Sequence, residues 1–237
     1  LSKNSPETGI RTFNSIKDHG LNISRAAFTS GSSAVDYILA YNISLFLSTD
    51  FDDVLHAISN NFPAGRILPT DIHDDIEDNE LRVAFDFDGV LADDEAEKVY
   101  SDSGQLELFH QHEVDNVSKP LNPGLLMEFL KKLAYFQKLE KKRADKDPEY
   151  EKILKTSIVT SRNAPSHERA INTLKNWEID VDEMFLLGGI EKKRILEILR
   201  PHLYVDDQLN HLNVDLKNIP LVHIPFGIAN KDLKKTG

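Results

Sequence analysis

Apolar residues in this chain form short continuous runs that alternate with segments of helical spacing. The clearest run is Val83 to Phe85, and such runs are typical of strands buried in a parallel sheet. Further strands are predicted at residues 26–29, 43–47, 153–160, 184–187, 202–205 and 221–225, and helices at 12–19, 32–40, 52–58, 94–100, 121–139, 166–177 and 192–200. This alternation predicts an α/β fold, with helices on the faces of a parallel sheet.

An acidic stretch at residues 69–80 divides the chain. It lacks the glycine and the ligand spacing of an EF-hand calcium loop, so we interpret it as a solvated linker. We therefore expect an N-terminal half at residues 1–68 and a second half at residues 81–237. At 237 residues the chain is long enough for one large α/β domain or for a core domain with a small cap.

Composition excludes several classes of protein. The net charge of −11 disfavours nucleic acid as a partner. The absence of cysteine excludes disulfides, thiol catalysis and Cys-ligated zinc. No apolar run approaches the roughly 18 residues of a membrane span, and no signal peptide is visible. We expect a cytoplasmic protein that binds neither nucleic acid nor membrane, and, because the chain begins at Leu1 without a methionine, a further stretch upstream.

Two carboxylates follow the run that ends at Phe85. Asp86 and Asp88 are two residues apart and therefore share one face of an extended strand, and Gly89 suits a sharp turn. Active sites in open α/β sheets lie beyond the carboxyl ends of strands. Neighbouring carboxylates repel unless they share a proton or bind a cation, and hard oxygen ligands suit Mg²⁺. An acidic turn without function is the alternative, since Asp-x-Asp is common by chance.

Other predicted strands also end in polar groups. Thr160 ends one strand, Lys192 follows the next after Gly188-Gly189, and Asp206 and Asp207 end a third. Each of these alone is usually structural. In this chain order, together with Asp86-Phe87-Asp88-Gly89, they resemble the four motifs of the haloacid dehalogenase superfamily.

The resemblance implies a Rossmann-like core with a mainly helical cap inserted after the first motif, at about residues 93–152. It also implies Mg²⁺-dependent phosphoryl transfer through an aspartyl-phosphate. The implied catalytic residues are Asp86 as nucleophile, Asp88 as acid and base, and Thr160 and Lys192 as the phosphoryl clamp. The implied metal ligands are Asp86, the backbone carbonyl of Asp88, and a carboxylate from Asp206 or Asp207. Lys193 directly follows Lys192, and we assign Lys192 for its distance from Arg200-Pro201.

Several segments more closely resemble the cytosolic 5'-nucleotidase I family. They are Leu81–Asp86, Asp94–Glu97, Phe109–Glu113, Val159–Arg162, Phe185–Gly189, Val205–Gln208 and His223–Gly227. The resemblance implies a nucleoside 5'-monophosphate as substrate and partner, bound by Ser161, Arg162, Asn163, Phe109 and His112. A helical surface patch is the alternative for Phe109 and His112. A phosphatase for sugar phosphates or other small phosphoesters and a catalytically inactive nucleotide-binding or scaffold protein are the alternative functions, and homo-oligomer formation is left open.

The N-terminal half matches part of the second half when the sequence is shifted by 158 positions. Arg11–Lys17 then falls on Arg169–Lys175, and Ser44–Leu47 on His202–Val205. The catalytic positions do not repeat, because Ser48-Thr49 falls on Asp206-Asp207. We therefore expect a degenerate partial repeat of the core with a structural role, whose missing strand precedes Leu1.

Overall fold

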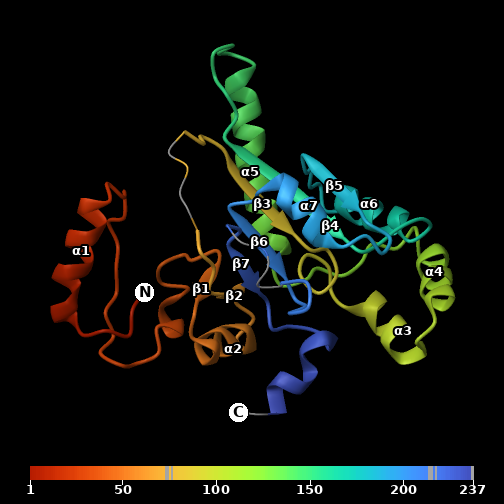
Figure 1. Cartoon of the computed structure of the whole chain (residues 1–237), viewed down its shortest axis with the longest axis horizontal. Helices are drawn as coiled ribbons and strands as arrows, with labels where there is room; N and C mark the ends of the chain where they lie inside the picture. Colours follow the sequence, from red (N-terminus) through yellow and green to blue (C-terminus); the bar gives the residue numbers. More distant parts are fainter. Residues whose placement is uncertain (73–74, 76, 213–215, 217, 236–237) are drawn as a thin grey trace.

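A single seven-stranded sheet runs through the computed structural model, which describes residues 1–72, 75, 77–212, 216 and 218–235 (Figure 1). The strand order is β1-β2-β7-β6-β3-β4-β5, and only the β2–β7 pair is antiparallel. The strands are β1 Phe46–Ser48, β2 Ala64–Ile67, β3 Leu81–Phe85, β4 Leu154–Thr160, β5 Glu183–Leu186, β6 Leu203–Asp206 and β7 Leu221–His223. The predicted α/β class with a largely parallel sheet is therefore confirmed.

Helices cover both faces of this sheet. The helices that do so are α2 Phe51–Ser59, α5 Met127–Ala144, α6 His167–Asn176 and α7 Lys192–Leu199. The other described helices are α1 Gly9–Asp18, α3 Glu95–Ser103 and α4 Leu106–Asp115, with 3₁₀ segments at Pro6–Thr8, Val35–Tyr37 and Ile228–Lys235. One apolar core lies under α2, α5 and α6, and a second lies under α7. No described helix combines the length and the apolar content that crossing a membrane requires.

The central strands supply both cores by strict alternation. In β3, Val83 and Phe85 belong to the core under α5 and α6, while Ala84 belongs to the core under α7. In β6, Val205 and Tyr204 divide in the same way. Successive strand residues point to opposite faces, so a strand covered on both sides is apolar at every position. This requirement explains why the continuous apolar runs located these strands correctly.

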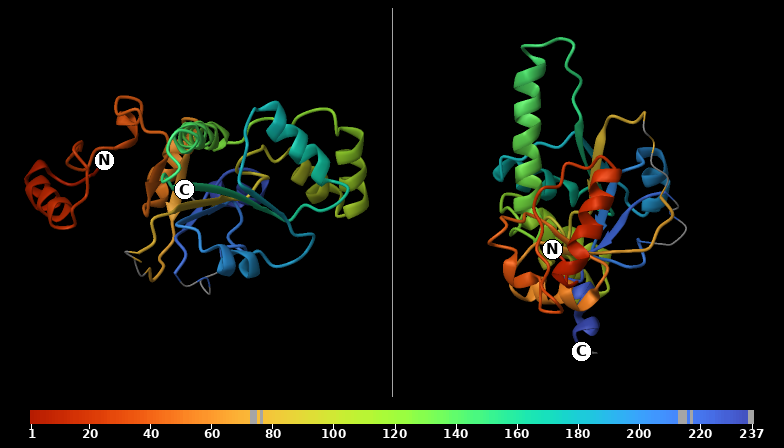
Figure 2. Two further views of the ribbon diagram at one scale, coloured as in Figure 1. Left: turned by 90° about the horizontal axis from the view of Figure 1, so that it is seen from above. Right: turned by 90° about the vertical axis from the view of Figure 1, so that its left-hand side faces the viewer.

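The N-terminal segment departs from its predicted elements. Residues 26–29 form no strand, and Phe28 makes only an isolated bridge to Ser2. Residues 32–40 form no α-helix beyond the 3₁₀ turn Val35–Tyr37. Both predictions were wrong, and the segment lies beside the sheet edge rather than on it (Figure 2). Val35 and Ile38 are buried in the core, but Leu39, which the helical pattern placed on the same apolar face, is 73% exposed, so the segment packs through a single turn and not through a longer helix. Conversely, β2 was not predicted, since Gly65 interrupts its apolar pattern.

The two halves share one sheet across the predicted linker. Strands β1 and β2 join the remaining strands through the β2–β7 pair. A Cβ on Gly65 would lie 2.2 Å from Cγ1 of Val222, so the glycine permits this close approach of the strands. Within the linker at 69–80, positions 73, 74 and 76 lie outside the described residues. The division into two halves stays a prediction, although the sheet runs through both.

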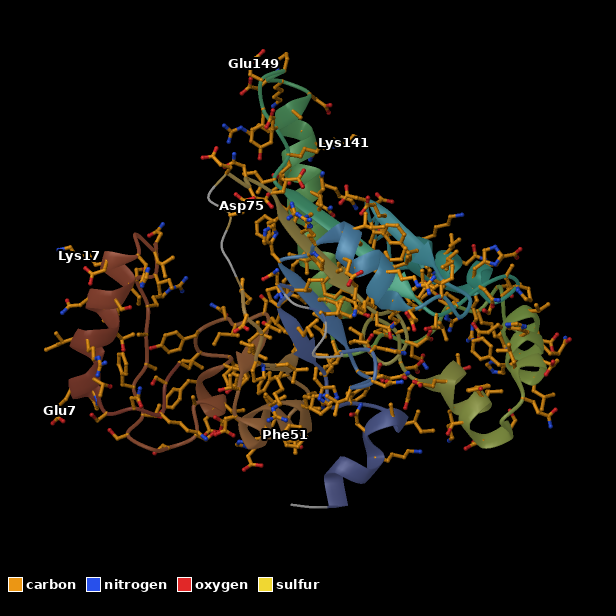
Figure 3. All side chains as sticks on the ribbon, viewed as in Figure 1. Glu7, Lys17, Phe51, Asp75, Lys141 and Glu149 are labelled. Carbon is orange, nitrogen blue, oxygen red and sulfur yellow. The ribbon has the colours of Figure 1, made fainter. Side chains whose placement is uncertain are left out.

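The range predicted as a cap contains three helices with different positions. α5 packs on the sheet through Leu130 and Ala134, and its outer end near Lys141 projects past the strands (Figure 3). α3 and α4 lie beyond the carboxyl ends of the strands and contact each other (Figure 1). These two helices are therefore the part of residues 93–152 that can cap a site at the strand ends.

Candidate active site

The strand ends bring the predicted residues of three motifs together. β3 lies between β6 and β4, and all three run parallel, so their carboxyl ends meet at one edge of the sheet. Asp86 follows β3, Thr160 ends β4 and Asp206 ends β6. All three side chains are buried. The register also fixes Asp86, whose backbone N–H donates to the carbonyl of Val205 at 2.8 Å.

Lys192 is the buried cation of this cluster. Its Nζ lies 2.7 Å from Oδ2 of Asp86 and 2.8 Å from Oδ2 of Asp206. Burial alone would lower the pKa of Lys192, but these two carboxylates raise it above its usual value. Lys193 lies 39% exposed with Glu197 3.9 Å away on the helix surface. The first turn of α7 thus directs Lys192, and not its neighbour, to the strand ends.

Asp206 has its hydrogen-bonding capacity filled. Oδ2 accepts from Lys192 and from the Tyr204 hydroxyl at 2.5 Å, and Oδ1 accepts from the backbone N–H of Gln208 at 2.8 Å. His211 Nδ1 lies 3.2 Å from Oδ2. Burial alone would raise the pKa of Asp206, but Lys192 and His211 hold it below the usual range.

Asp207 has the opposite surroundings. Both of its carboxylate oxygens are buried and have no hydrogen-bond partner among the described residues. Burial, together with Asp86 and Asp206 nearby, raises the pKa of Asp207 strongly. Gly89, with φ of +73°, approaches this carboxylate so closely that a Cβ would lie 2.4 Å from Oδ2. A buried carboxylate without a partner is costly unless it is protonated or binds a cation.

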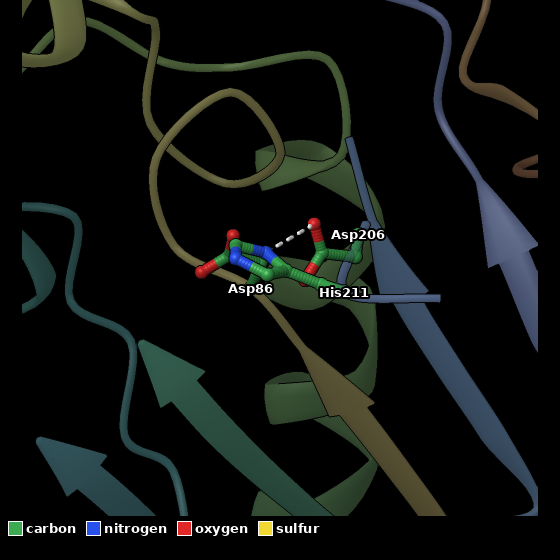
Figure 4. Close-up of side chains that lie close together, drawn as sticks. All are labelled: Asp86, Asp206 and His211. Carbon is green, nitrogen blue, oxygen red and sulfur yellow. Dashed lines mark hydrogen bonds and ion pairs between the residues drawn. The ribbon is translucent and has the colours of Figure 1, made fainter. Parts of the chain in front are cut away.

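The donor set fits a divalent cation that prefers oxygen. Asp86, Asp206 and His211 each offer one ligand atom within 4.8 Å of the others (Figure 4). The oxygens of Asp206 are already engaged, whereas those of Asp207 have no partner among the described residues, which favours Asp207 as a direct ligand beside Asp86. Asp207 lies outside the group of three residues whose ligand atoms are within 4.8 Å of one another, so its role rests on its unpaired oxygens and not on that geometry. Carboxylate and carbonyl oxygens are the ligands that Mg²⁺ prefers. The residues present therefore fit the magnesium ion implied by the sequence.

Asp88 is held by an arginine from the neighbouring strand end. Nε and Nη2 of Arg162 donate to the two Asp88 oxygens at 2.7 Å each, a bidentate geometry. Nη1 of Arg162 donates to Glu113 of α4, which also accepts from Nη1 of Arg169 at 2.8 Å. Glu113, Arg162 and Arg169 are almost fully buried. This network connects the acid–base candidate to the cap.

A cavity of about 280 Å³ opens above the strand ends. Its walls include Asp86, Asp88, Thr160, Ser161, Arg162, Asn163 and Phe109 from the predicted set, and Glu97, Tyr100, Leu106, Gln208 and His211, which were not predicted. Predicted His112 does not line it, and instead lies 3.5 Å from Glu95 and 3.3 Å from Glu113. Two larger hollows lie on the exposed surface of α1 and contain none of the clustered carboxylates.

Contacts between α4 and the loop after β4 hold Phe109 and Asn163 at the cavity. The guanidinium of Arg162 lies 5.4 Å from the Phe87 ring centre and 5.6 Å from that of Phe109, which fixes the Phe109 ring against the site. The amide oxygen of Asn163 lies 3.2 Å from Nε2 of His110. Both contacts join α4 to the loop after β4.

Comparison with known proteins identifies the family. The family model described as 5'-nucleotidase matches residues 1–231. The chain belongs to the 5'-nucleotidase family. A human protein named cytosolic 5'-nucleotidase 1B is 34% identical over 213 residues, which are 90% of this chain and 34% of that protein. This 5'-nucleotidase family chain therefore spans about one third of the length of that relative. No solved structure gave a significant match.

Proposed function

We propose that this chain hydrolyses nucleoside 5'-monophosphates by a Mg²⁺-dependent mechanism through an aspartyl-phosphate. The observation that carries the proposal is the buried Lys192 that bridges Asp86 and Asp206, beside an Asp207 whose carboxylate has no partner among the described residues. Of these residues, Asp86 lines the cavity at the strand ends. Family membership supports the class of reaction. The word cytosolic in the name of the human relative supports the proposal that the activity is cytoplasmic.

Asp86 is the proposed nucleophile. Its carboxylate attacks phosphorus, forms an aspartyl-phosphate and releases the nucleoside alkoxide. Burial raises the pKa of Asp86 to about 6, against the opposing effect of Lys192. The Lys192 ammonium and the buried Thr160 hydroxyl are the proposed donors to the phosphoryl oxygens. A magnesium ion held by Asp86, Asp207 and the Asp88 carbonyl would, when bound, offset the charge of those oxygens.

Asp88 is the proposed acid and base. When its carboxyl carries a proton, for which one of the two hydrogen bonds from Arg162 must open, Asp88 gives that proton to the leaving alkoxide. The carboxylate that results takes a proton from the water that hydrolyses the aspartyl-phosphate, which restores the starting form. The Arg162 fork fixes the orientation of its carboxylate, and Glu113 and the Ser166 carbonyl, 3.0 Å from Nη1, fix Arg162 in turn. Orientation of this kind is what proton transfer in a transition state requires.

The substrate proposal rests on the cavity wall. Tyr100, Leu106 and Phe109 form an apolar side above the polar floor, which suits a planar base attached to a phosphorylated sugar. Ser161, Arg162 and Asn163 contribute polar groups from the loop after β4.

A phosphate-release assay tests the function. Nucleoside 5'-monophosphates, nucleoside 3'-monophosphates and sugar phosphates are compared at equal concentration, each with Mg²⁺ and with EDTA. The proposal expects the highest kcat/KM for the 5'-nucleotides and loss of turnover in EDTA. Equal or better turnover of sugar phosphates would show that the substrates are sugar phosphates or other small phosphoesters. No turnover of any ester would favour a nucleotide-binding or scaffold protein.

A further inference from the structure

Glu97 is a half-buried acid in the cavity wall that the proposed chemistry does not use. It lies in the first turn of α3, and its Oε1 accepts from Nε2 of Gln208 at 2.7 Å. Its other oxygen, Oε2, is buried without a hydrogen-bond partner among the described residues. Buried polar atoms in folded proteins are nearly always paired. We therefore expect Oε2 of Glu97 to accept a hydrogen bond from a ligand that enters the cavity.

Glu97 lies between the polar floor of the cavity and its apolar side. Asp86 and Asp88 lie at the strand ends, and Glu97 lies near both. Tyr100 is one helical turn farther along α3, about 4.5 Å at the rise of an α-helix, and is 48% exposed. From the floor outward the cavity thus presents the phosphoryl site, then the Glu97 carboxyl, then an apolar side. A nucleoside 5'-monophosphate presents phosphate, sugar hydroxyls and a planar base in the same order.

The charges around Glu97 indicate which part of a nucleotide, the phosphate or the sugar hydroxyls, can bind beside it. The two buried cations near the floor, Lys192 and Arg162, already pair with Asp86, Asp206, Asp88 and Glu113. A phosphate at Glu97 would meet a carboxyl group and no free cation among the described residues that line the cavity. A neutral diol has no such repulsion, and its two O–H groups are donors for a carboxylate oxygen.

We propose that Glu97 accepts hydrogen bonds from the ribose hydroxyls of the substrate and selects for an intact ribose. The proposal deepens the proposed function and rests on it, because it assumes that the phosphate lies at Asp86. Gln208 acts as a positioning residue, since its amide fixes Oε1 and leaves Oε2 for the ligand.

The test compares a nucleoside 5'-monophosphate with its 2',3'-dideoxy analogue, which lacks both hydroxyls. Hydrogen bonds to charged groups suggest that kcat/KM of the wild-type protein falls by about tenfold to a hundredfold for the analogue. Glu97→Ala should hydrolyse both esters with similar kcat/KM, and Glu97→Gln should keep part of the discrimination. The 2'-deoxy and 3'-deoxy analogues assign the effect to one hydroxyl.

Glu107→Gln is the matched control, because Glu107 is exposed on α4 and does not line the cavity. It should discriminate like the wild type. A wild type that hydrolyses both esters equally well, or a Glu97→Ala that keeps full discrimination, would overturn the ribose proposal while the phosphatase function stands. A wild type that hydrolyses neither ester would overturn the proposed function itself. The wild-type comparison needs no variant, so a wild type without discrimination would refute the ribose proposal even if Glu97→Ala does not fold.

Discussion

Asp206 and Asp207 are adjacent in the sequence but are stabilised differently. Asp206 is neutralised by Lys192 and satisfied by Tyr204 and the backbone of Gln208. Asp207 is buried with both oxygens unpartnered among the described residues, and burial with nearby Asp86 raises the pKa of Asp207 to about 10. The sequence alone placed both at a strand end. It could not distinguish them, because the difference comes from residues distant along the chain.

The raised pKa of Asp207 predicts how stability depends on pH. A folded-state pKa above the unfolded value of about 4 means that the folded protein binds the proton more tightly. Its contribution to stability is full below pH 4 and is lost as pH rises toward 10. Without metal, the free energy of unfolding of the wild type should therefore fall relative to Asp207→Asn across this range, as measured by urea unfolding.

Mg²⁺ should remove this difference for the wild type and leave Asp207→Asn nearly unaffected, because the cation replaces the proton as the partner of the carboxylate. Asp71→Asn, at an exposed carboxylate remote from the strand ends, is the control. A wild type and an Asp207→Asn variant with parallel pH profiles and equal responses to Mg²⁺ would contradict the assignment of Asp207 as a metal ligand.

The central strands, which are buried on both faces of the sheet, were located correctly from the sequence. β3 and β4 are covered on both sides and were located from apolar runs, whereas β2 carries Gly65 to admit β7 and was missed. α1 and α6 correspond under the shift of 158 positions, yet Thr12 of α1 is exposed whereas its counterpart Ala170 of α6 is fully buried. The partial repeat therefore stays a prediction, because similar patterns lie in different surroundings.

One buried acid of α4, Glu113, anchors this helix to the core beside the contacts of Phe109 and His110. Glu113 accepts from Arg162 and Arg169, and all three side chains are almost completely buried. Glu113→Gln should leave two buried guanidinium groups without their shared anion, and breaking such a pair costs about 3–5 kcal/mol. We expect a loss of this size in the free energy of unfolding, measured by urea denaturation.

Glu107→Gln, on the exposed side of the same helix, should change stability by no more than about 0.5 kcal/mol. An equally small change for Glu113→Gln would show that the cap does not depend on this network. The sequence indicated Glu113 only as part of a group with Phe109 and His112 that could contact a substrate or form a helical surface patch, since nothing in the helical pattern shows which acid faces two arginines.

The topology of the whole molecule explains why the meeting of the strand-end residues was easier to predict than the residues that line the cavity. Parallel strands bring their carboxyl ends to one edge, so Asp86, Thr160 and Asp206 meet for topological reasons. The cavity wall depends on how α3 and α4 fold back over that edge, which no spacing rule fixes. Glu97 and His211 were missed for this reason, and His112 was placed at the substrate although it faces Glu95 and Glu113.

Trapping the covalent intermediate tests the central claim most directly. The protein is mixed with a nucleoside 5'-monophosphate labelled with ³²P and Mg²⁺, quenched in acid, and assayed for protein-bound label. Label should appear on the wild type and accumulate on Asp88→Asn, which cannot activate the second water. Asp86→Asn should carry no label and lose about 10³-fold or more in turnover. An Asp86→Asn variant that still turns over near the wild-type rate, or still becomes labelled, would contradict Asp86 as the nucleophile.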